Sequence, residues 1–136
     1  MSGGRYVPQE MTTIQQSAED YLECILMLSK EHGGDVHAID VAHALEVSKP
    51  SVSIAMKKLR ERKLITVDES GAIKFTKAGK KIAENTYAKH KLLKAILIDI
   101  GVDVDTAEEE ACMIEHVICD DTYNKLLKAF NKEIPE

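Results

Sequence analysis

The sequence predicts a mainly α-helical fold, in which a helix-turn-helix unit with a small β-hairpin precedes an all-helical C-terminal region. Apolar residues recur at intervals of three and four over most of the 136 residues, which is the spacing of helices that bury one face. Two short β-type runs surround a Glu-Ser-Gly turn near the middle of the chain. Basic and acidic residues also fall into separate blocks.

The first helix is expected to begin at Ser17, because serine is a favoured N-cap and Asp20 follows three residues later. It should stop at the glycine pair 33–34. Residues 1–11 lack helical periodicity, and we expect them to form a flexible tail. A second, short helix is predicted from Ala38 to Leu45.

The third helix is predicted from Ser48 to about Arg62, with Ser48 as its cap. Pro50 suits the first turn, where the missing amide hydrogen of proline does no harm. Residues 64–67 and 72–76 then form two short strands of a hairpin. Helix, short helix, turn, basic helix and hairpin is the order of a winged helix-turn-helix, whose second helix of the pair enters the major groove of DNA.

The rest of the chain is predicted to be helical. A long helix should run over residues 77–100 and end at Gly101. Thr106 should cap the next helix, which should run to about Ile118, and Asp121 or Thr122 should start the last one.

These elements divide the chain into two domains after the tail. Residues 12–77 are predicted to be a winged helix-turn-helix DNA-binding domain. Residues 78–136 should hold a linker helix and further helices. Dimerisation would help a chain of this size, because its own core is modest.

The formal net charge of −5 conceals a strong segregation of charge. Residues 49–94 carry 13 basic and 4 acidic side chains, whereas residues 1–48 carry 2 and 8, and residues 95–136 carry 3 and 11. A basic block inside an acidic protein suits a domain that meets a polyanion. A solvated lysine-rich surface is the simpler alternative.

Cysteine usage and hydropathy indicate the compartment. The three cysteines show no paired spacing and no apolar signal segment precedes them, so we expect free thiols in a reducing cytoplasm. No apolar run approaches the roughly 18 residues that a membrane-spanning helix needs, which argues against a membrane protein.

The third helix carries the residue types that a DNA-reading helix needs. Small polar residues near its start permit close approach to base edges, and cations toward its end pair with phosphates, as would a lysine in the wing. The chain is only 4% aromatic, which favours duplex DNA over a single-strand stacking platform. The candidates from this reasoning are Ser48, Ser51, Ser53, Lys57, Lys58, Arg60 and Lys74.

Metal-ligating side chains recur at helical spacing in the second domain. Cys112, Glu115 and His116, at offsets of zero, three and four, would share one face of a helix. Their mixed softness points to a divalent transition metal rather than to calcium, magnesium or a closed zinc site. Taken singly, each also suits an ordinary core or surface role. Further candidates are two carboxylates three residues apart on the first helix and a histidine midway along the linker helix. The full set of candidate ligands is Asp20, Glu23, His90, Cys112, Glu115 and His116.

Four segments, AEDYLECI, SKPSVSIAMKKLRE, YAKHKLL and EEEACMIEHVI, resemble the diphtheria toxin repressor family of metal-dependent transcription regulators. The similarity covers roughly residues 12–131, and the short length resembles the manganese transport regulator branch. The resemblance implies a homodimer that binds double-stranded operator DNA and represses metal-homeostasis genes. It also implies that residues 78–136 form a linker helix and an all-helical metal-binding and dimerisation domain. Mn(II) or Fe(II) would be the corepressor.

Position by position, the manganese branch implies metal binding by five of the six candidate ligands. Cys112 instead matches the iron branch, while Asp20 matches the manganese branch, so the ligand set is a hybrid. Glu108 and Lys94 stand where the iron branch has an ancillary metal site, and the lysine argues against such a site. Pro50, with its serine neighbours, matches residues near the bases in relatives, whereas Ile54 replaces a common polar residue.

One ion bound by ligands from both domains would hold two DNA-reading helices at a fixed spacing, which is the expected mechanism. Two rivals stay open. A metalloenzyme uses similar ligands, although no nucleophile or phosphate-loop motif is present in the sequence. A winged-helix regulator that answers to a small molecule, or to a thiol oxidant through Cys112 or Cys119, is the second. The physiological metal, the number of ions and the operator sequence also stay open.

Overall fold

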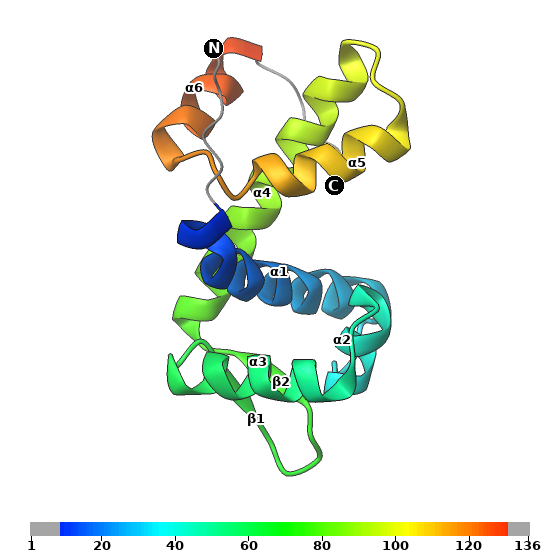
Figure 1. Cartoon of the computed structure of the whole chain (residues 1–136), viewed down its shortest axis with the longest axis vertical. Coiled ribbons are helices and arrows are strands. Elements are labelled where there is room, and N and C mark those ends of the chain that lie inside the picture. Colours follow the sequence, from blue (N-terminus) through cyan, green and yellow to red (C-terminus); the bar gives the residue numbers. More distant parts are fainter. Residues whose placement is uncertain (1–8, 131–136) are drawn as a thin grey trace. The chain divides into compact units, whose positions relative to one another are not determined.

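The computed structural model describes residues 9–130, with side chains from Ala18 onward. The chain forms two compact units, one ending at Ala83 and the other beginning at Glu84. Figure 1 shows the elements in chain order, and the mainly helical fold with one hairpin is as predicted. Their bounds are α1 (Gln9–His32), α2 (Ala38–Leu45), α3 (Lys49–Glu61), β1 (Ile65–Val67), β2 (Ile73–Phe75), α4 (Lys77–Asp99), α5 (Val104–Ile114) and α6 (Asp120–Phe130).

The first unit is built on three mutually packed helices. In Figure 1, α1 and α3 run alongside each other, and α2 packs against both. Each helix contributes an apolar stripe to a shared core, and each large side chain buried there contributes about 1.5–3 kcal/mol of hydrophobic free energy. The most buried members of this core are Leu22, Ile25, Val41, Val52 and Leu59.

The start of α3 is fixed by a capped turn after α2. Glu46 closes α2 in the left-handed conformation, at φ 56°, and its amide hydrogen bonds back to carbonyls of that helix. Ser48 then caps α3, with its Oγ accepting from the backbone N–H of Ser51 at 3.2 Å. Pro50 occupies the first turn of α3, as predicted.

The hairpin is short and tied to the helices at both ends. Its strands pair antiparallel, with Ile65 opposite Phe75 and Val67 opposite Ile73. Asp68 closes the turn by accepting from the backbone N–H groups of Ser70 and Ala72, and hydrogen bonds from these residues lower the pKa of its carboxyl group.

Two backbone contacts position the hairpin. The N–H of Ile73 donates to the carbonyl of Val36 at 2.8 Å, which adds the loop before α2 to the sheet edge. Gly79, in the first turns of α4, lies against the Leu64 carbonyl, and an added Cβ would overlap with that oxygen. The entry of α4 therefore requires a residue without a side chain.

In the second unit, the C-terminal part of α4 packs with α5 and α6. Its core contains Leu92, Leu93 and Ile96 from α4 and two alanines from α5, Ala107 and Ala111. A buried ammonium reinforces it, because Nζ of Lys89 donates to the Ile118 carbonyl at 3.0 Å and pairs with Asp120 at 3.2 Å. The segment before α6 is thereby held against α4.

The observed N-terminal boundary of α1 corrects the prediction. The helix begins at Gln9 instead of Ser17, so residues 9–11 of the expected tail are helical, and residues 1–8 lie outside the described part. The intervening stretch, rich in glutamine and free of glycine and proline, offers nothing to stop a helix. Gly33, at φ 66°, follows the end of α1, as predicted.

The second correction concerns α5. Its cap is Asp103, not Thr106, because an Asp103 carboxylate oxygen accepts from the Thr106 N–H at 3.0 Å. These hydrogen bonds from Thr106 lower the pKa of the Asp103 carboxyl group. The helix also ends at Ile114, earlier than the sequence pattern predicted.

Over residues 9–130, no helix combines the length and the apolar character that crossing a bilayer requires.

Candidate metal centre and DNA-reading helix

A buried carboxylate, that of Glu115, lies at the centre of the candidate metal centre in the second unit. Its side chain has no exposed surface. Oε1 lies 2.8 Å from Nδ1 of His90 on α4, and Oε2 lies 3.4 Å from Nε2 of His116. Two imidazoles from different segments thus meet one buried carboxylate.

Cys112 completes this group from one turn earlier. The ligand atoms of Cys112, Glu115 and His116 all lie within 4.8 Å of one another. Although α5 ends at Ile114, Glu115 keeps helical angles, and the His116 N–H bonds three residues back, to the Met113 carbonyl at 3.4 Å. The tightened last turn preserves the neighbourhood that the offsets of three and four predicted.

The donor set fits a divalent transition metal ion. A carboxylate without exposed surface carries a large desolvation cost unless positive charge lies beside it. Thiolate and imidazole ligands favour ions of intermediate softness, and a carboxylate also suits Mn(II). Cys112, Glu115 and His116 could supply all three kinds of ligand from one short segment.

His90 also links this group to a surface pair. Its Nε2 lies 3.1 Å from Oε1 of Glu108, which pairs with Nζ of Lys94 at 2.9 Å. Partial burial would raise the pKa of Glu108, but hydrogen bonds from Lys94 and His90 outweigh it and lower that pKa. Lys94 therefore supplies the positive charge next to Glu108, where the iron branch was expected to hold an ancillary metal.

The two remaining candidate ligands lie in the first unit, on α1. Asp20 is half-buried and Glu23 is 5% exposed, and three residues separate them, so both point from similar sides of the helix. Burial, followed by the charges of Glu23, Glu31 and Asp20, raises the pKa of the Cys24 thiol to about 11. Several carboxylates therefore lie close enough to the Cys24 thiol to act on it.

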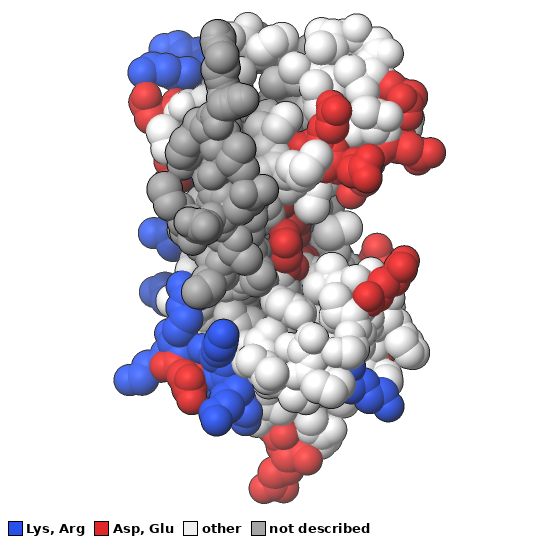
Figure 2. Space-filling model, viewed as in Figure 1, with Lys and Arg blue, Asp and Glu red and all other residues white. Residues whose placement is uncertain are grey.

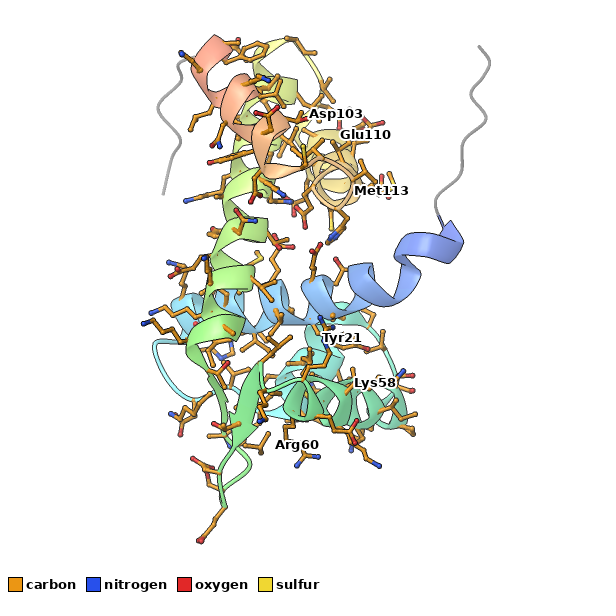
Figure 3. The ribbon with its side chains drawn as sticks, turned by 90° about the vertical axis from the view of Figure 1, so that its left-hand side faces the viewer. Tyr21, Lys58, Arg60, Asp103, Glu110 and Met113 are labelled. Carbon is orange, nitrogen blue, oxygen red and sulfur yellow. The ribbon has the colours of Figure 1, made fainter. Side chains whose placement is uncertain are left out.

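The predicted DNA-reading residues on α3 and at its cap are all exposed. Val52, Met56 and Leu59 face the core, and the opposite side of the helix presents polar and basic groups. Figure 2 shows basic side chains gathered around the end of α3, and Figure 3 shows Arg60 projecting from the side of α3 away from α1. The exposed candidates are Ser48, Pro50, Ser51, Ser53, Lys57, Lys58 and Arg60.

Lys74, the candidate in the wing, already has an ionic partner. Its Nζ lies 3.1 Å from a carboxylate oxygen of Asp35, and both side chains are more than half exposed. An exposed pair of this kind is worth about 0–1 kcal/mol, so it leaves the ammonium able to exchange partners.

Sequence profiles of known families match both halves of the chain. Residues 13–73 match the description "Iron dependent repressor, N-terminal DNA binding domain". Residues 76–132 match "Iron dependent repressor, metal binding and dimerisation domain".

Individual relatives agree with these profiles. The chain is 32% identical to the uncharacterised HTH-type transcriptional regulator MJ0568 of Methanocaldococcus jannaschii, over 83% of this chain and 91% of that protein. It is 31% identical to the diphtheria toxin repressor of Corynebacterium diphtheriae, over 87% of this chain but only 52% of the repressor. The chain thus spans about half the length of that repressor.

A solved structure repeats the pattern. The manganese regulator SloR superimposes with a TM-score of 0.75 at 33% identity, over 84% of this chain and 53% of SloR. With both of its halves matched in sequence and its fold shared with such regulators, the chain belongs to the iron-dependent repressor family, also known from the diphtheria toxin repressor.

Proposed function

We propose that this protein is a metal-dependent transcriptional repressor, which binds operator DNA as a homodimer when Mn(II) or Fe(II) is present. The observation that carries the proposal is the buried carboxylate of Glu115, which lies 2.8 Å from one imidazole and 3.4 Å from another, with the Cys112 thiol nearby. Residues 12–77 would read DNA, and residues 78–136 would bind metal and dimerise.

Six side chains would hold the ion. Four come from the second unit, and the two carboxylates on α1 come from the DNA-reading unit. The bound ion would supply positive charge that draws carboxylates of both units together. The full set is Asp20, Glu23, His90, Cys112, Glu115 and His116.

The ligands couple metal to DNA because they belong to both units. Without a cation, the carboxylates of Asp20, Glu23 and Glu115 would repel one another if brought close, which favours their separation. Each copy in a dimer presents one α3, and half-sites lie about 34–36 Å apart, so any ordering of the two units reduces the entropy lost on docking. Turning a 1:99 equilibrium into 99:1 requires about 5.5 kcal/mol of preferential binding, which several ligand bonds can supply.

On the DNA side, the proposed roles follow the chemistry of each group. The short residues Ser48, Pro50, Ser51 and Ser53 allow α3 to approach base edges. The cations bind phosphates and set most of the affinity, and they are Lys57, Lys58, Arg60 and Lys74.

Dimerisation would use the second unit. Large apolar side chains on it are exposed, and a two-fold interface buries the same patch on both copies. They include Ile98, Ile100, Val104, Met113 and Val117. We propose that the protein acts by binding DNA and metal and catalyses no reaction. Its place of action would be the cytoplasm.

The choice of metal depends on Cys112. Its thiolate favours Fe(II), whereas the three carboxylates favour Mn(II), and the relatives include both an iron-dependent repressor and a manganese regulator. Anaerobic purification followed by elemental analysis and operator binding with each ion would decide between them. Because Lys94 pairs with Glu108, we expect no further metal site at Glu108.

The central experiment replaces His116 with alanine. We expect His116→Ala to abolish metal-stimulated operator binding and to keep the helical circular dichroism signal. His32→Ala is the matched control, since His32 is exposed at the end of α1. Equal operator affinity of the variant and the parent protein in excess Mn(II) and Fe(II) would contradict the proposal.

A second experiment tests the phosphate role of Arg60. We expect Arg60→Ala to weaken binding to all duplexes and to reduce the slope of log affinity against log salt by about 0.9, the value for one phosphate contact. Lys128→Ala, an exposed change on α6, should leave the slope unchanged. An unaltered slope for Arg60→Ala would argue against the contact.

One observation favours a second candidate, a regulator that senses thiol oxidants. Cys119 is exposed, and a hydrogen bond with Thr122 lowers the pKa of its thiol, which increases the reactive thiolate fraction. A DNA-binding assay that compares peroxide with metal titration separates the two. Loss of DNA binding on oxidation of Cys119, with no response to metal, would favour the thiol sensor.

A further inference from the structure

Ile54 is a large apolar side chain on a helix surface that is otherwise polar and basic. It is 58% exposed, more than any other large apolar side chain described in the first unit. Because the side chain is exposed, it gains hydrophobic free energy only where a partner covers it. A partner with an apolar surface would therefore gain binding free energy by covering Ile54.

Its position on α3 defines where that ligand lies. The buried residues Val52, Met56 and Leu59 mark the inward face. At about 100° per residue, Ile54 is about 200° from Val52, which places it near the centre of the outward face. Pro50 lies one turn earlier on the same line, and Lys57 lies beside it one turn later.

The charges around Ile54 favour duplex DNA as the partner that covers it. Lys57 and Lys58 follow it on exposed positions, and Ser51 and Ser53 flank it with short hydroxyl side chains. A protein partner would need a wider apolar patch than one isoleucine among serines and lysines. A helix with these side chains has the charge and the slim profile that the major groove accepts.

Within the major groove, only one base edge offers an apolar group. Thymine carries a 5-methyl group, whereas the other bases present hydrogen-bond donors and acceptors that an isoleucine would leave unsatisfied. We propose that Ile54 selects a thymine in each operator half-site through contact with its 5-methyl group. This inference rests on the proposed function and adds a specificity-determining residue to it.

The test removes single methyl groups from DNA. The full chain with Mn(II) first selects its preferred duplex from a randomised library, and deoxyuridine then replaces each thymine in turn. At one position of each half-site, we expect loss of the methyl group to weaken binding about fourfold. A duplex with cytosine in place of that thymine should also bind more weakly. Replacing this cytosine with 5-methylcytosine, which carries the same methyl group as thymine, should recover part of the affinity.

Variants at position 54 assign the effect to this side chain. Ile54→Ala should bind the thymine and uracil duplexes equally at that position, because the side chain that contacts the methyl group is gone. Its salt slope should be unchanged, because no charge is removed. The variant should still fold, because the side chain at position 54 is exposed. Ile54→Gln should shift the preferred base there to adenine. Ile39→Ala, a control on α2 at 41% exposure, should keep the parental preference for thymine.

The outcomes separate the inference from the function beneath it. Metal-dependent duplex binding with no methyl-sensitive position, or with unaltered sensitivity in Ile54→Ala, overturns the inference and leaves the proposed function standing. A lower association state of Ile54→Ala with unchanged base preference assigns the side chain to a protein interface and also overturns it. If the parent protein binds no duplex with any metal, both fall together.

Discussion

Ser48 combines two roles that a set of substitutions can separate. Its Oγ accepts from the Ser51 N–H at 3.2 Å and so caps α3, and it is also a candidate to approach DNA. Ser48→Ala removes the acceptor from a helix terminus that is exposed, so no cavity forms. The expected cost is therefore that of a cap alone, about 1 kcal/mol of unfolding free energy.

Charge distinguishes the cap from the DNA contact. Ser48→Asp keeps an acceptor for Ser51 and favours the helix dipole, so we expect near-parental stability. The same carboxylate would repel DNA phosphates, so we expect weaker operator binding. Ser48→Asn keeps the cap without the charge and should stay close to the parent protein in both measurements.

Urea unfolding followed by circular dichroism in a chelator measures the stability, and operator binding at fixed salt measures the affinity. A loss of 1 kcal/mol corresponds to a fall of about 4 °C in Tm for a protein of this size. Ser53→Ala is the control for the stability measurement alone, since Ser53 is exposed and does not cap the helix. Parental stability of Ser48→Ala would refute the cap, and parental operator affinity of Ser48→Asp would refute its nearness to phosphate.

Three further predictions concern other elements. Gly79→Ala should destabilise the first unit by about 1–3 kcal/mol, measured by urea unfolding, because its methyl group would meet a backbone carbonyl. Hydrogen bonds lower the pKa of Asp103, so its stabilising effect is present above its unfolded pKa and is lost as the pH falls through the folded value. Asp103→Asn should therefore lose less stability than the parent protein between about pH 5 and pH 3, in parallel unfolding titrations. Cys119 should react with a thiol reagent at pH 7.5 well before Cys24, whose pKa is raised to about 11, as peptide mapping would show.

Each of these has a matched comparison. Gly34→Ala adds a Cβ whose nearest neighbour is 4.0 Å away, so it should leave stability unchanged or raise it by about 0.4–1 kcal/mol. Equal destabilisation by the two glycine variants would show that the close approach at Gly79 is not the cause. An acid profile unchanged in Asp103→Asn, or faster labelling of Cys24 in the folded protein, would contradict the other two predictions.

The sequence predicted the helices and the wing because their local signals are strong. Ser48, Pro50 and the glycines after α1 act within a few residues of the ends that they mark. The start of α5 was wrong by a few residues because two capping residue types, Asp103 and Thr106, lie in one turn, and only the backbone conformation decides which oxygen accepts.

The candidate site was predictable in its local part alone. Cys112, Glu115 and His116 lie together because their spacing is helical. The contact between His90 and Glu115 joins residues 25 apart, and it depends on how α4 packs against α5. No periodicity along the chain specifies that distance, and the same holds for the pairing of Lys94 with Glu108.

The bond from Ile73 to Val36 places β2 between β1 and the loop before α2, so the hairpin joins the helices through its second strand. Lys74 and Asp35, the adjacent residues, pair across the same junction. The hairpin cannot change its direction without breaking these two contacts. Its direction is therefore set by the first unit itself and does not depend on bound nucleic acid. Insertions at the turn, residues 68–71, would lengthen the hairpin without changing the angle between the hairpin and the helices of the first unit.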